Sequence, residues 1–180
     1  MFRLRSCILL LWVAVASWPA VSEGTPTGEV CLRDRPCWQA LDRALSVARE
    51  NSQVTLVFVS ARGCGPCRLM ENEVLPEVRP LLDQMALAKL DMTDNSMLLA
   101  FNNGVITPSR AALQMGIEST PGFVLVDPEG TPILRETGLL DATAFGLFLA
   151  YGTTGAYRHG SFADYAAAMR WPPGAAVGGE

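Results

Sequence analysis

The sequence has no excess of positive charge and only one histidine. Its 180 residues include 14 Lys and Arg against 18 Asp and Glu, a formal net charge of −4, and a single histidine, His159. Without an excess of positive charge, nucleic acid is not expected as a partner. His159 has no second ligand candidate beside it, so we expect a surface residue rather than a catalytic one. No internal repeat is present.

Long apolar runs are scarce as well. The run over residues 7–16 follows a short arginine-containing start and precedes small residues at Ala20 and Ser22. This pattern is typical of a secretory signal peptide, here residues 1–22. The run is shorter than the roughly 20 apolar residues that a membrane span needs. We therefore expect a periplasmic or otherwise exported protein, soluble after cleavage and without stable membrane insertion. An uncleaved anchor is the alternative.

The remaining chain is long enough for one domain. Residues 23–30 are rich in Gly, Thr and Pro and are expected to form a linker. The domain is expected to span residues 31–170. Residues 171–180, rich in Pro, Gly and Ala, are expected to form a flexible tail.

Two cysteines lie between a strand pattern and a helix pattern. The apolar run from Val54 to Val59 is typical of a strand buried on both faces, and Cys64-Gly65-Pro66-Cys67 follows it at the opening of a predicted helix. Unpaired N–H groups and peptide dipoles at a helix start favour negative charge, which stabilises a thiolate at Cys64. Cys67, one turn further on, can attack a mixed disulfide formed at Cys64. A static disulfide or half a zinc site is the alternative, but this context favours redox chemistry.

A second cysteine pair lies nearer the N-terminus. Cys31 and Cys37 have five residues between them, which allows a structural disulfide. The pair could instead exchange electrons with Cys64 and Cys67, or bind a metal. Cys7 is expected to leave with the signal peptide. The remaining four cysteines suit an oxidising compartment.

These residues resemble a known family. Cys64-Gly-Pro-Cys67 is the active-site tetrapeptide of thioredoxins, and residues 116–126, which include Thr120-Pro121, resemble the family's segment with a cis-proline facing the cysteines. Residues 87–91 resemble its third strand, so the resemblance covers about residues 52–150. The pattern Cys-x-x-Cys-Arg-x-Met-Glu is more similar to exported thioredoxin-like proteins, such as the C-terminal domain of the transmembrane thiol carrier DsbD and thioredoxins associated with sulfur oxidation.

The resemblance implies an α/β protein with the thioredoxin fold. A central mixed sheet of four or five strands is flanked by helices, with an added C-terminal helix over residues 151–170. It also implies a protein-disulfide reductase in which Cys64 is the nucleophile and Cys67 the resolving cysteine. Pro121 would be the cis-proline, and Thr120 would offer backbone groups to an extended substrate segment. The implied partners are a disulfide-containing protein and a transmembrane thiol carrier as electron donor, with no cofactor.

The sequence departs from the family at positions that matter. Phe58 stands where thioredoxins carry a buried aspartate, and Gly63 replaces the tryptophan before the first cysteine. Lys89 matches the lysine that neighbours this aspartate, so its usual partner is absent. Glu71, four residues after Cys67 and on the same helix face, could act as proton acceptor in its place. Glu71 could equally be a solvated helix residue.

Two further readings stay open. The same dithiol could oxidise or isomerise disulfides if the electron donor is lacking. The protein could also be a non-catalytic thioredoxin-fold binding module, or hold zinc through Cys31, Cys37, Cys64 and Cys67, since four sulfurs at about 2.3 Å make a tetrahedral site.

The local patterns predict several element boundaries. A helix is expected to begin at Asp34 or Arg35, with Trp38 on its apolar face. Residues 93–112 are longer than the family needs, and the Asn102-Asn103-Gly104 turn within them is either a partner-binding rim or tolerated surface variation. Residues 123–136 predict a β-hairpin. Helix caps are predicted at Thr107, Gly116, Asp141 and Ser161.

Overall fold

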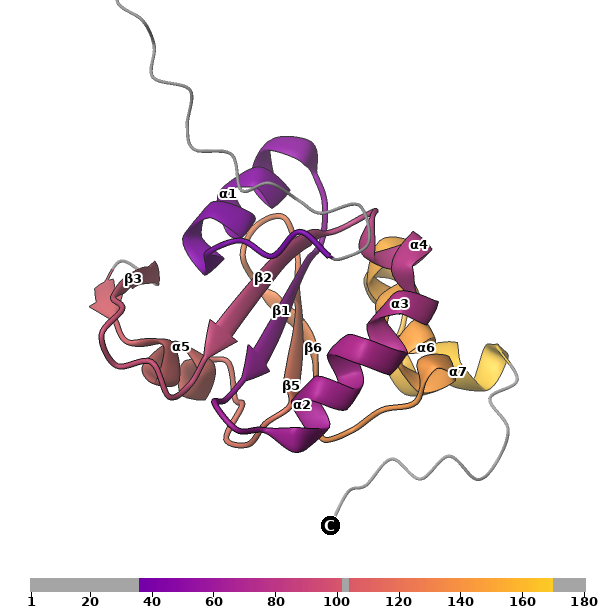
Figure 1. Cartoon of the computed structure of the whole chain (residues 1–180). Coiled ribbons are helices and arrows are strands. Elements are labelled where there is room, and N and C mark those ends of the chain that lie inside the picture. Colours follow the sequence, from indigo (N-terminus) through magenta and orange to yellow (C-terminus); the bar gives the residue numbers. More distant parts are fainter. Residues whose placement is uncertain (1–35, 102–103, 170–180) are drawn as a thin grey trace, which may run out of the picture.

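Four strands form one mixed sheet at the centre of the molecule (Figure 1). The computed structural model describes residues 36–101 and 104–169. The strand order is β2 (Ala86–Asp91), β1 (Thr55–Ser60), β5 (Gly122–Val126) and β6 (Pro132–Thr137). Strands β1 and β2 run parallel, and the other two pairings are antiparallel. The expected mixed sheet is confirmed with four strands, and all six residues of β1 are buried.

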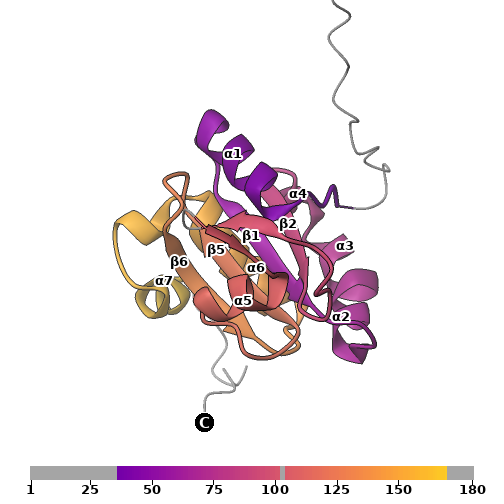
Figure 2. The same cartoon turned by 90° about the vertical axis from the view of Figure 1, so that its left-hand side faces the viewer.

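Helices cover both faces of this sheet (Figure 1 and Figure 2). One face packs against α6 (Ala142–Thr153) and a helical run made of α2 (Gly65–Leu69), the π-helical turn η1 (Met70–Val74), α3 (Leu75–Glu77) and α4 (Arg79–Leu82). The other face packs against α1 (Leu41–Asn51) and α5 (Pro108–Gln114). A 3₁₀ turn, η2 (Ala156–Arg158), and the predicted C-terminal helix, α7 (Phe162–Ala168), complete the described chain.

Strand alternation divides the core into two apolar clusters, because successive side chains point to opposite faces. Phe58 of β1 stacks on Phe123 of β5 at a centroid distance of 5.1 Å, and Phe123 packs on Phe145 of α6 at 4.7 Å. Val57 and Val59 face the other cluster, under α1 and α5. Both faces of β1 are therefore dry, as a continuous apolar run predicts.

The helical run after the cysteines is irregular. In η1 the N–H of Leu75 donates to the carbonyl oxygen of Met70, five residues back rather than four. The run breaks at Val78, between α3 and α4, where φ is −99° and ψ is 12°. Pro76 and Pro80 flank this break, and each lacks the backbone N–H that a continuous helix would use.

The predicted start of the first helix is wrong. Helix α1 begins at Leu41, whereas Asp34 and Arg35 lie outside the described residues. The chain before Leu41 is held extended because Gln39 forms a bridge with β2: its N–H donates to Leu87 O at 2.9 Å, and its carbonyl accepts from Lys89 N at 3.3 Å. Strand pairing thus replaces only the start of the helix that the apolar spacing predicted, and the helix itself forms from Leu41.

The predicted caps are confirmed. The side chain of Thr107 accepts from the N–H of Arg110 at the start of α5, and Asp141 accepts from the N–H of Ala144 at the start of α6. Gly116, just beyond α5, has a φ of +79°, which favours glycine at a helix C-terminus. The side chain of Ser161 likewise caps α7 by accepting from the N–H of Asp164 at 3.2 Å. The predicted β5–β6 hairpin also forms.

Residues 93–107 contain two strands that the sequence did not predict. Strands β3 (Leu99–Phe101) and β4 (Gly104–Ile106) pair antiparallel beyond the edge of β2. Asn102 and Asn103 of the predicted turn lie outside the described residues. Each strand has three residues, too few for an alternation pattern to stand out in the sequence.

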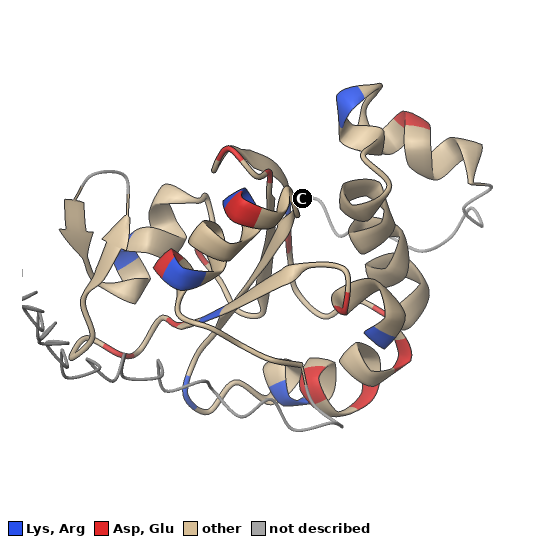
Figure 3. Cartoon of the chain, turned by 90° about the horizontal axis from the view of Figure 1, so that it is seen from above, with Lys and Arg blue, Asp and Glu red and all other residues tan. Residues whose placement is uncertain are grey.

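Three predicted segments fall outside the described residues. These are the signal peptide over 1–22, the linker over 23–30 and the tail over 171–180. Within the described residues, none of the helices is both long and apolar enough to span a membrane. Acidic and basic residues are interspersed over the described surface, and α6 carries neither (Figure 3).

Helix α7 is attached to the domain through Tyr151 of α6. The Tyr151 hydroxyl donates to Gly160 O at 2.7 Å, and its ring lies 5.4 Å from that of Phe162 and 5.5 Å from that of Tyr165. Burial raises the pKa of the Tyr151 phenol, which stays a neutral donor at physiological pH.

We expect Tyr151→Phe to lower the free energy of unfolding by about 1 kcal/mol, because it removes one partly buried hydrogen bond and keeps the ring contacts. Urea denaturation followed by circular dichroism measures this change. Tyr157→Phe, at a half-buried tyrosine in η2, is the matched control and should change stability by less than about 0.5 kcal/mol. Equal effects of the two substitutions would contradict the assignment of this bond.

Candidate active site

The strand β1 leads directly into the two cysteines. After Ser60 the chain turns through Gly63, whose φ is +80°, and the N–H of Cys64 donates to Ala61 O at 3.1 Å. Cys64 is the N-cap of α2, and its Sγ accepts from the N–H of Cys67 at 3.1 Å. A backbone donor at the helix start therefore points at this sulfur, as a site for a thiolate requires.

The two cysteines are joined by a disulfide across a Cα–Cα distance of 5.3 Å. Cys64 is half-buried, whereas Cys67 is only 3% exposed. Cys64 is therefore the more accessible of the two to an incoming sulfur, while Cys67 is almost fully covered. This division suits an attacking outer cysteine and a resolving inner one.

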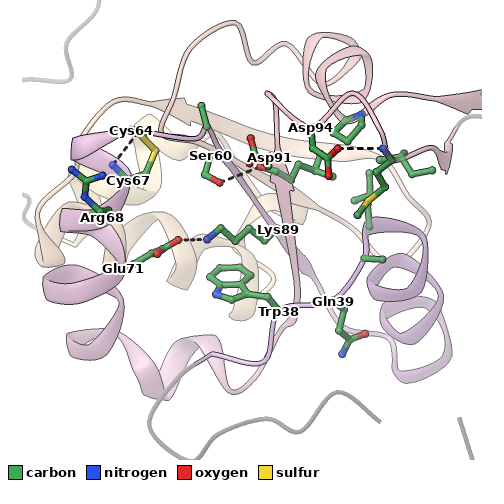
Figure 4. Close-up of a pocket in the computed structure, with 18 residues that line it drawn as sticks. Trp38, Gln39, Ser60, Cys64, Cys67, Arg68, Glu71, Lys89, Asp91 and Asp94 are labelled. Atoms are coloured by element: carbon green, nitrogen blue, oxygen red, sulfur yellow. Dashed lines mark hydrogen bonds and ion pairs between the residues drawn. A yellow bond between two sulfur atoms is a disulfide. The ribbon is translucent and has the colours of Figure 1, made fainter. Parts of the chain in front are cut away.

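A cavity of about 620 Å³ lies beside the disulfide (Figure 4). Both cysteines line it, together with Trp38, Glu71 and Lys89. Glu71 projects from η1 and Lys89 from β2, and the two side chains form an ion pair, each about a third exposed. The carboxylate thus lies in the same water-accessible cavity as the buried sulfur.

The Lys89–Glu71 ion pair gives Lys89 a partner that the sequence did not indicate. Lys89 was expected to lack its usual partner, because Phe58 replaces the family's buried aspartate. Phe58 is fully buried and pairs in register with Lys89 on the neighbouring strand, with the Lys89 Nζ 5.5 Å from its ring centroid. The partner of Lys89 is instead Glu71, which comes from the helix rather than from the strand.

Trp38 is a cavity residue that sequence reasoning put on a helix. It precedes α1, and its ring lies 5.6 Å from that of Phe58. Since this placement depends on the bridge between Gln39 and Ala88, a pairing distant in sequence, no local signal could have indicated it.

The Thr120–Pro121 peptide bond is cis. It precedes β5, whose residue Gly122 pairs with Val59 near the end of β1. Register therefore brings Thr120 and Pro121 to the end of the sheet from which the chain leads to Cys64. The carbonyl oxygen of Pro121 accepts from the N–H of Gly138 at 2.8 Å, which joins this segment to the end of β6.

Hydrogen bonds hold the loop that follows β2. Asp91 accepts from the N–H and hydroxyl of Thr93, and these bonds lower the pKa of the Asp91 carboxyl. Asp94 accepts from the N–H and hydroxyl of Ser96, which lowers its pKa in the same way. Both carboxylates therefore form hydrogen bonds within the loop and hold its conformation.

Other predicted site residues are not brought together. Cys37 is half-buried beside Trp38, but Cys31 lies outside the described residues, so their pairing stays a prediction. Cys64 and Cys67 are bonded to each other here, and the described residues contain no group of three or more His, Cys, Asp or Glu that could hold a metal. His159 is exposed before α7, as predicted.

Solved structures with a similar fold include three from bacteria. A thioredoxin from Thermus thermophilus is 21% identical with a TM-score of 0.53, covering 69% of this chain and 95% of its own. A thioredoxin-fold protein from Helicobacter pylori is 19% identical with a TM-score of 0.52, covering 67% and 81%. The oxidised DsbD C-terminal domain from Neisseria meningitidis is 20% identical with a TM-score of 0.50, covering 62% and 92%. At these identities the likeness concerns the fold.

The comparison with sequence families is more specific. No curated protein sequence matches the chain significantly. The thioredoxin-like domain family matches residues 41–153, which include β1, the Cys64–Cys67 disulfide, the cis Thr120–Pro121 bond and all four strands of the central sheet. The chain therefore belongs to the thioredoxin-like domain family and has its α/β fold.

Proposed function

We propose that this protein is a thiol–disulfide oxidoreductase that reduces protein disulfides in an exported compartment. The observation that carries the proposal is the Cys64–Cys67 disulfide at the start of α2, with one cysteine half-buried and the other buried. A static disulfide does not require its two cysteines to differ in exposure. Thiol–disulfide exchange requires one cysteine that a substrate can reach and a second, less exposed cysteine that resolves the mixed disulfide.

The reaction moves two electrons from the protein to the substrate. The Cys64 thiolate attacks one sulfur of the substrate disulfide, and the other substrate sulfur leaves as a thiolate that takes up a proton. Cys67 then loses its proton and attacks Cys64 Sγ. The second substrate thiol is released, and the protein is left with the Cys64–Cys67 disulfide.

Glu71 is our candidate for the group that accepts the proton of Cys67. Both side chains line the same cavity, and the ion pair with Lys89 fixes the carboxylate there. Thr120 and Pro121 would meet the substrate, with backbone groups of Thr120 pairing with an extended segment that carries its disulfide. This assignment carries over from the family resemblance.

The rest of the proposal concerns the cellular setting. We propose a signal peptide over residues 1–22, a linker over 23–30, a domain over 31–170 and a tail over 171–180. Export would require an electron donor such as a transmembrane thiol carrier to return the disulfide to the dithiol. Cys31 and Cys37 would form a structural disulfide.

Cys64→Ser should abolish catalysed reduction, because it removes the nucleophile. Cys67→Ser should instead trap a mixed disulfide at Cys64. Insulin reduction by dithiothreitol, followed by turbidity, measures the first effect, and mass spectrometry under non-reducing conditions detects the second. Retained turnover in Cys64→Ser would refute the mechanism.

The reduction potential decides the direction of exchange. We expect the Cys64/Cys67 pair to lie near that of thioredoxin, about −270 mV, so that it reduces substrates once supplied with electrons. Equilibration against a dithiothreitol series measures it. A potential above about −200 mV would make the protein an oxidant or isomerase. The Cys31→Ser/Cys37→Ser variant should show the same transition if that pair is structural.

Glu71→Gln should slow resolution of the mixed disulfide about tenfold at pH 7, because positioned general bases contribute substantially to proton transfer. The loss should shrink as pH rises, since Cys67 then ionises without help. Quenched-flow kinetics of the isolated resolving step measures both effects. Glu73→Gln, at an exposed glutamate in the same π-helical turn, is the control. Indistinguishable rates and pH profiles for the two variants would exclude the role of Glu71.

A further inference from the structure

The turn that leads from β1 into Cys64 is open to water. The N–H of Cys64 closes the turn by donating to Ala61 O at 3.1 Å, and Gly63 within it has a φ of +80°. Arg62 and Gly63 are exposed, and a Cβ added at Gly63 would meet no atom of the described residues within 4 Å. Because packing does not hold Gly63, the conformation of the turn depends on the hydrogen bonds that reach it.

Two hydrogen bonds reach this part of the chain from the loop after β2. The N–H of Met92 donates to Ser60 O at 2.8 Å, and the N–H of Arg62 donates to the Thr93 hydroxyl at 3.3 Å. The first bond joins two backbone groups, so any residue except proline at position 92 could form it. The second bond requires a side-chain acceptor at position 93. Thr93 therefore contributes something that the backbone alone does not.

Asp91 orients the Thr93 hydroxyl. Its carboxylate accepts from the hydroxyl and from the N–H of Thr93, the latter at 2.8 Å. The bond from the hydroxyl is the main cause that lowers the pKa of the Asp91 carboxyl, and the nearby Arg62 lowers this pKa further. The carboxylate is therefore ionised at neutral pH and can only accept. Since the one hydroxyl proton is donated to Asp91, the lone pairs of Thr93 Oγ1 are left for the N–H of Arg62.

The position of Arg62 matters for the sulfur two residues further on. Cys64 Sγ accepts from the N–H of Cys67 at 3.1 Å, and Cys64 is the N-cap of α2. This donor stabilises a thiolate at Cys64 only while the backbone keeps the sulfur at the helix start. A turn released at Arg62 would let the backbone of Cys64 vary and would weaken this alignment.

We propose that Thr93 is a positioning residue for the nucleophile: its hydroxyl, oriented by Asp91, holds the turn so that Cys64 Sγ stays at the start of α2. The proposal rests on the function proposed above, in which Cys64 reacts as a thiolate. Thr93 does not line the cavity beside the disulfide and acts through the backbone of Arg62. Its role is thus separate from the proton transfer assigned to Glu71.

Thr93→Val tests this role, because it keeps the shape of the side chain and removes the acceptor oxygen. In the reduced protein, alkylation of Cys64 by iodoacetamide at pH 6 should slow about threefold, since less of the thiol is ionised. The midpoint of the pH profile should rise by about half a unit. At pH 10, where the thiol is ionised in both proteins, the rates should agree to within about twofold. Tandem mass spectrometry of the digested protein distinguishes Cys64 from Cys67.

Thr93→Ser keeps the hydroxyl and should restore the wild-type rate to within about 1.5-fold, which a loss of stability alone would not explain. The matched control is Thr154→Val just beyond α6, where the hydroxyl donates to Ala150 O at 2.6 Å. It should leave the Cys64 profile unchanged. Both threonines are exposed, and a thermal melt checks that each variant folds. An unchanged profile in Thr93→Val, the same shift in Thr93→Ser, or the same shift in Thr154→Val would each overturn the proposal.

Failure of the proposed function can be told apart from failure of the positioning. If wild type reduces insulin no faster than Cys64→Ser, thiol–disulfide exchange is refuted. Alkylation needs no disulfide substrate, so the pH profiles of wild type and Thr93→Val still test the role of Thr93. A wild-type midpoint at the ordinary thiol value of about 8.5 would overturn that role, because Cys64 would then have no stabilised thiolate to position.

Discussion

Complete burial of β1 is the constraint on which the rest of the structure depends. Its side chains alternate between two apolar clusters, while its backbone pairs with β2 and β5. A shift of one residue in either pairing would move every side chain to the wrong cluster. Cys64, four residues beyond Ser60, therefore starts α2 at a fixed point, and the cis Thr120–Pro121 segment approaches the same end of the sheet through β5.

The carboxylate in the cavity beside Cys67 comes from the helical run, and not from the strand position that the family resemblance predicts. Phe58 fills the strand position with an aromatic ring that joins the stack with Phe123, which strengthens the core but removes a buried charge. Glu71 restores a carboxylate next to Lys89 from the opposite wall. Because this pair is a third exposed, its charges are partly solvated, and holding them there costs less than burying an ion pair within the sheet.

Sequence alone was enough for the parts of the molecule that local rules determine. The buried strand over 54–59, the caps at Thr107 and Asp141, and the cysteines at a helix start each follow from a pattern within a few residues. The missed features depend on distant pairings. The start of α1 is set by the bridge between Gln39 and Ala88, and the partner of Lys89 comes from 18 residues earlier in the chain. The three-residue strands β3 and β4 are too short to show a period.

The π-helical turn has a consequence for how such a domain can change over evolution. Each residue of an α-helix turns the chain by about 100°, but η1 holds one residue more than an α-helical turn, so deleting one residue there would restore a regular α-helix with Leu75 and Val78 still facing the core. A deletion elsewhere between Cys67 and these two residues would instead rotate both side chains away from the core. We expect descendants of this sequence to gain and lose residues between β3 and β4 and to lose one residue at η1, while the rest of the helical run after the cysteines keeps its count.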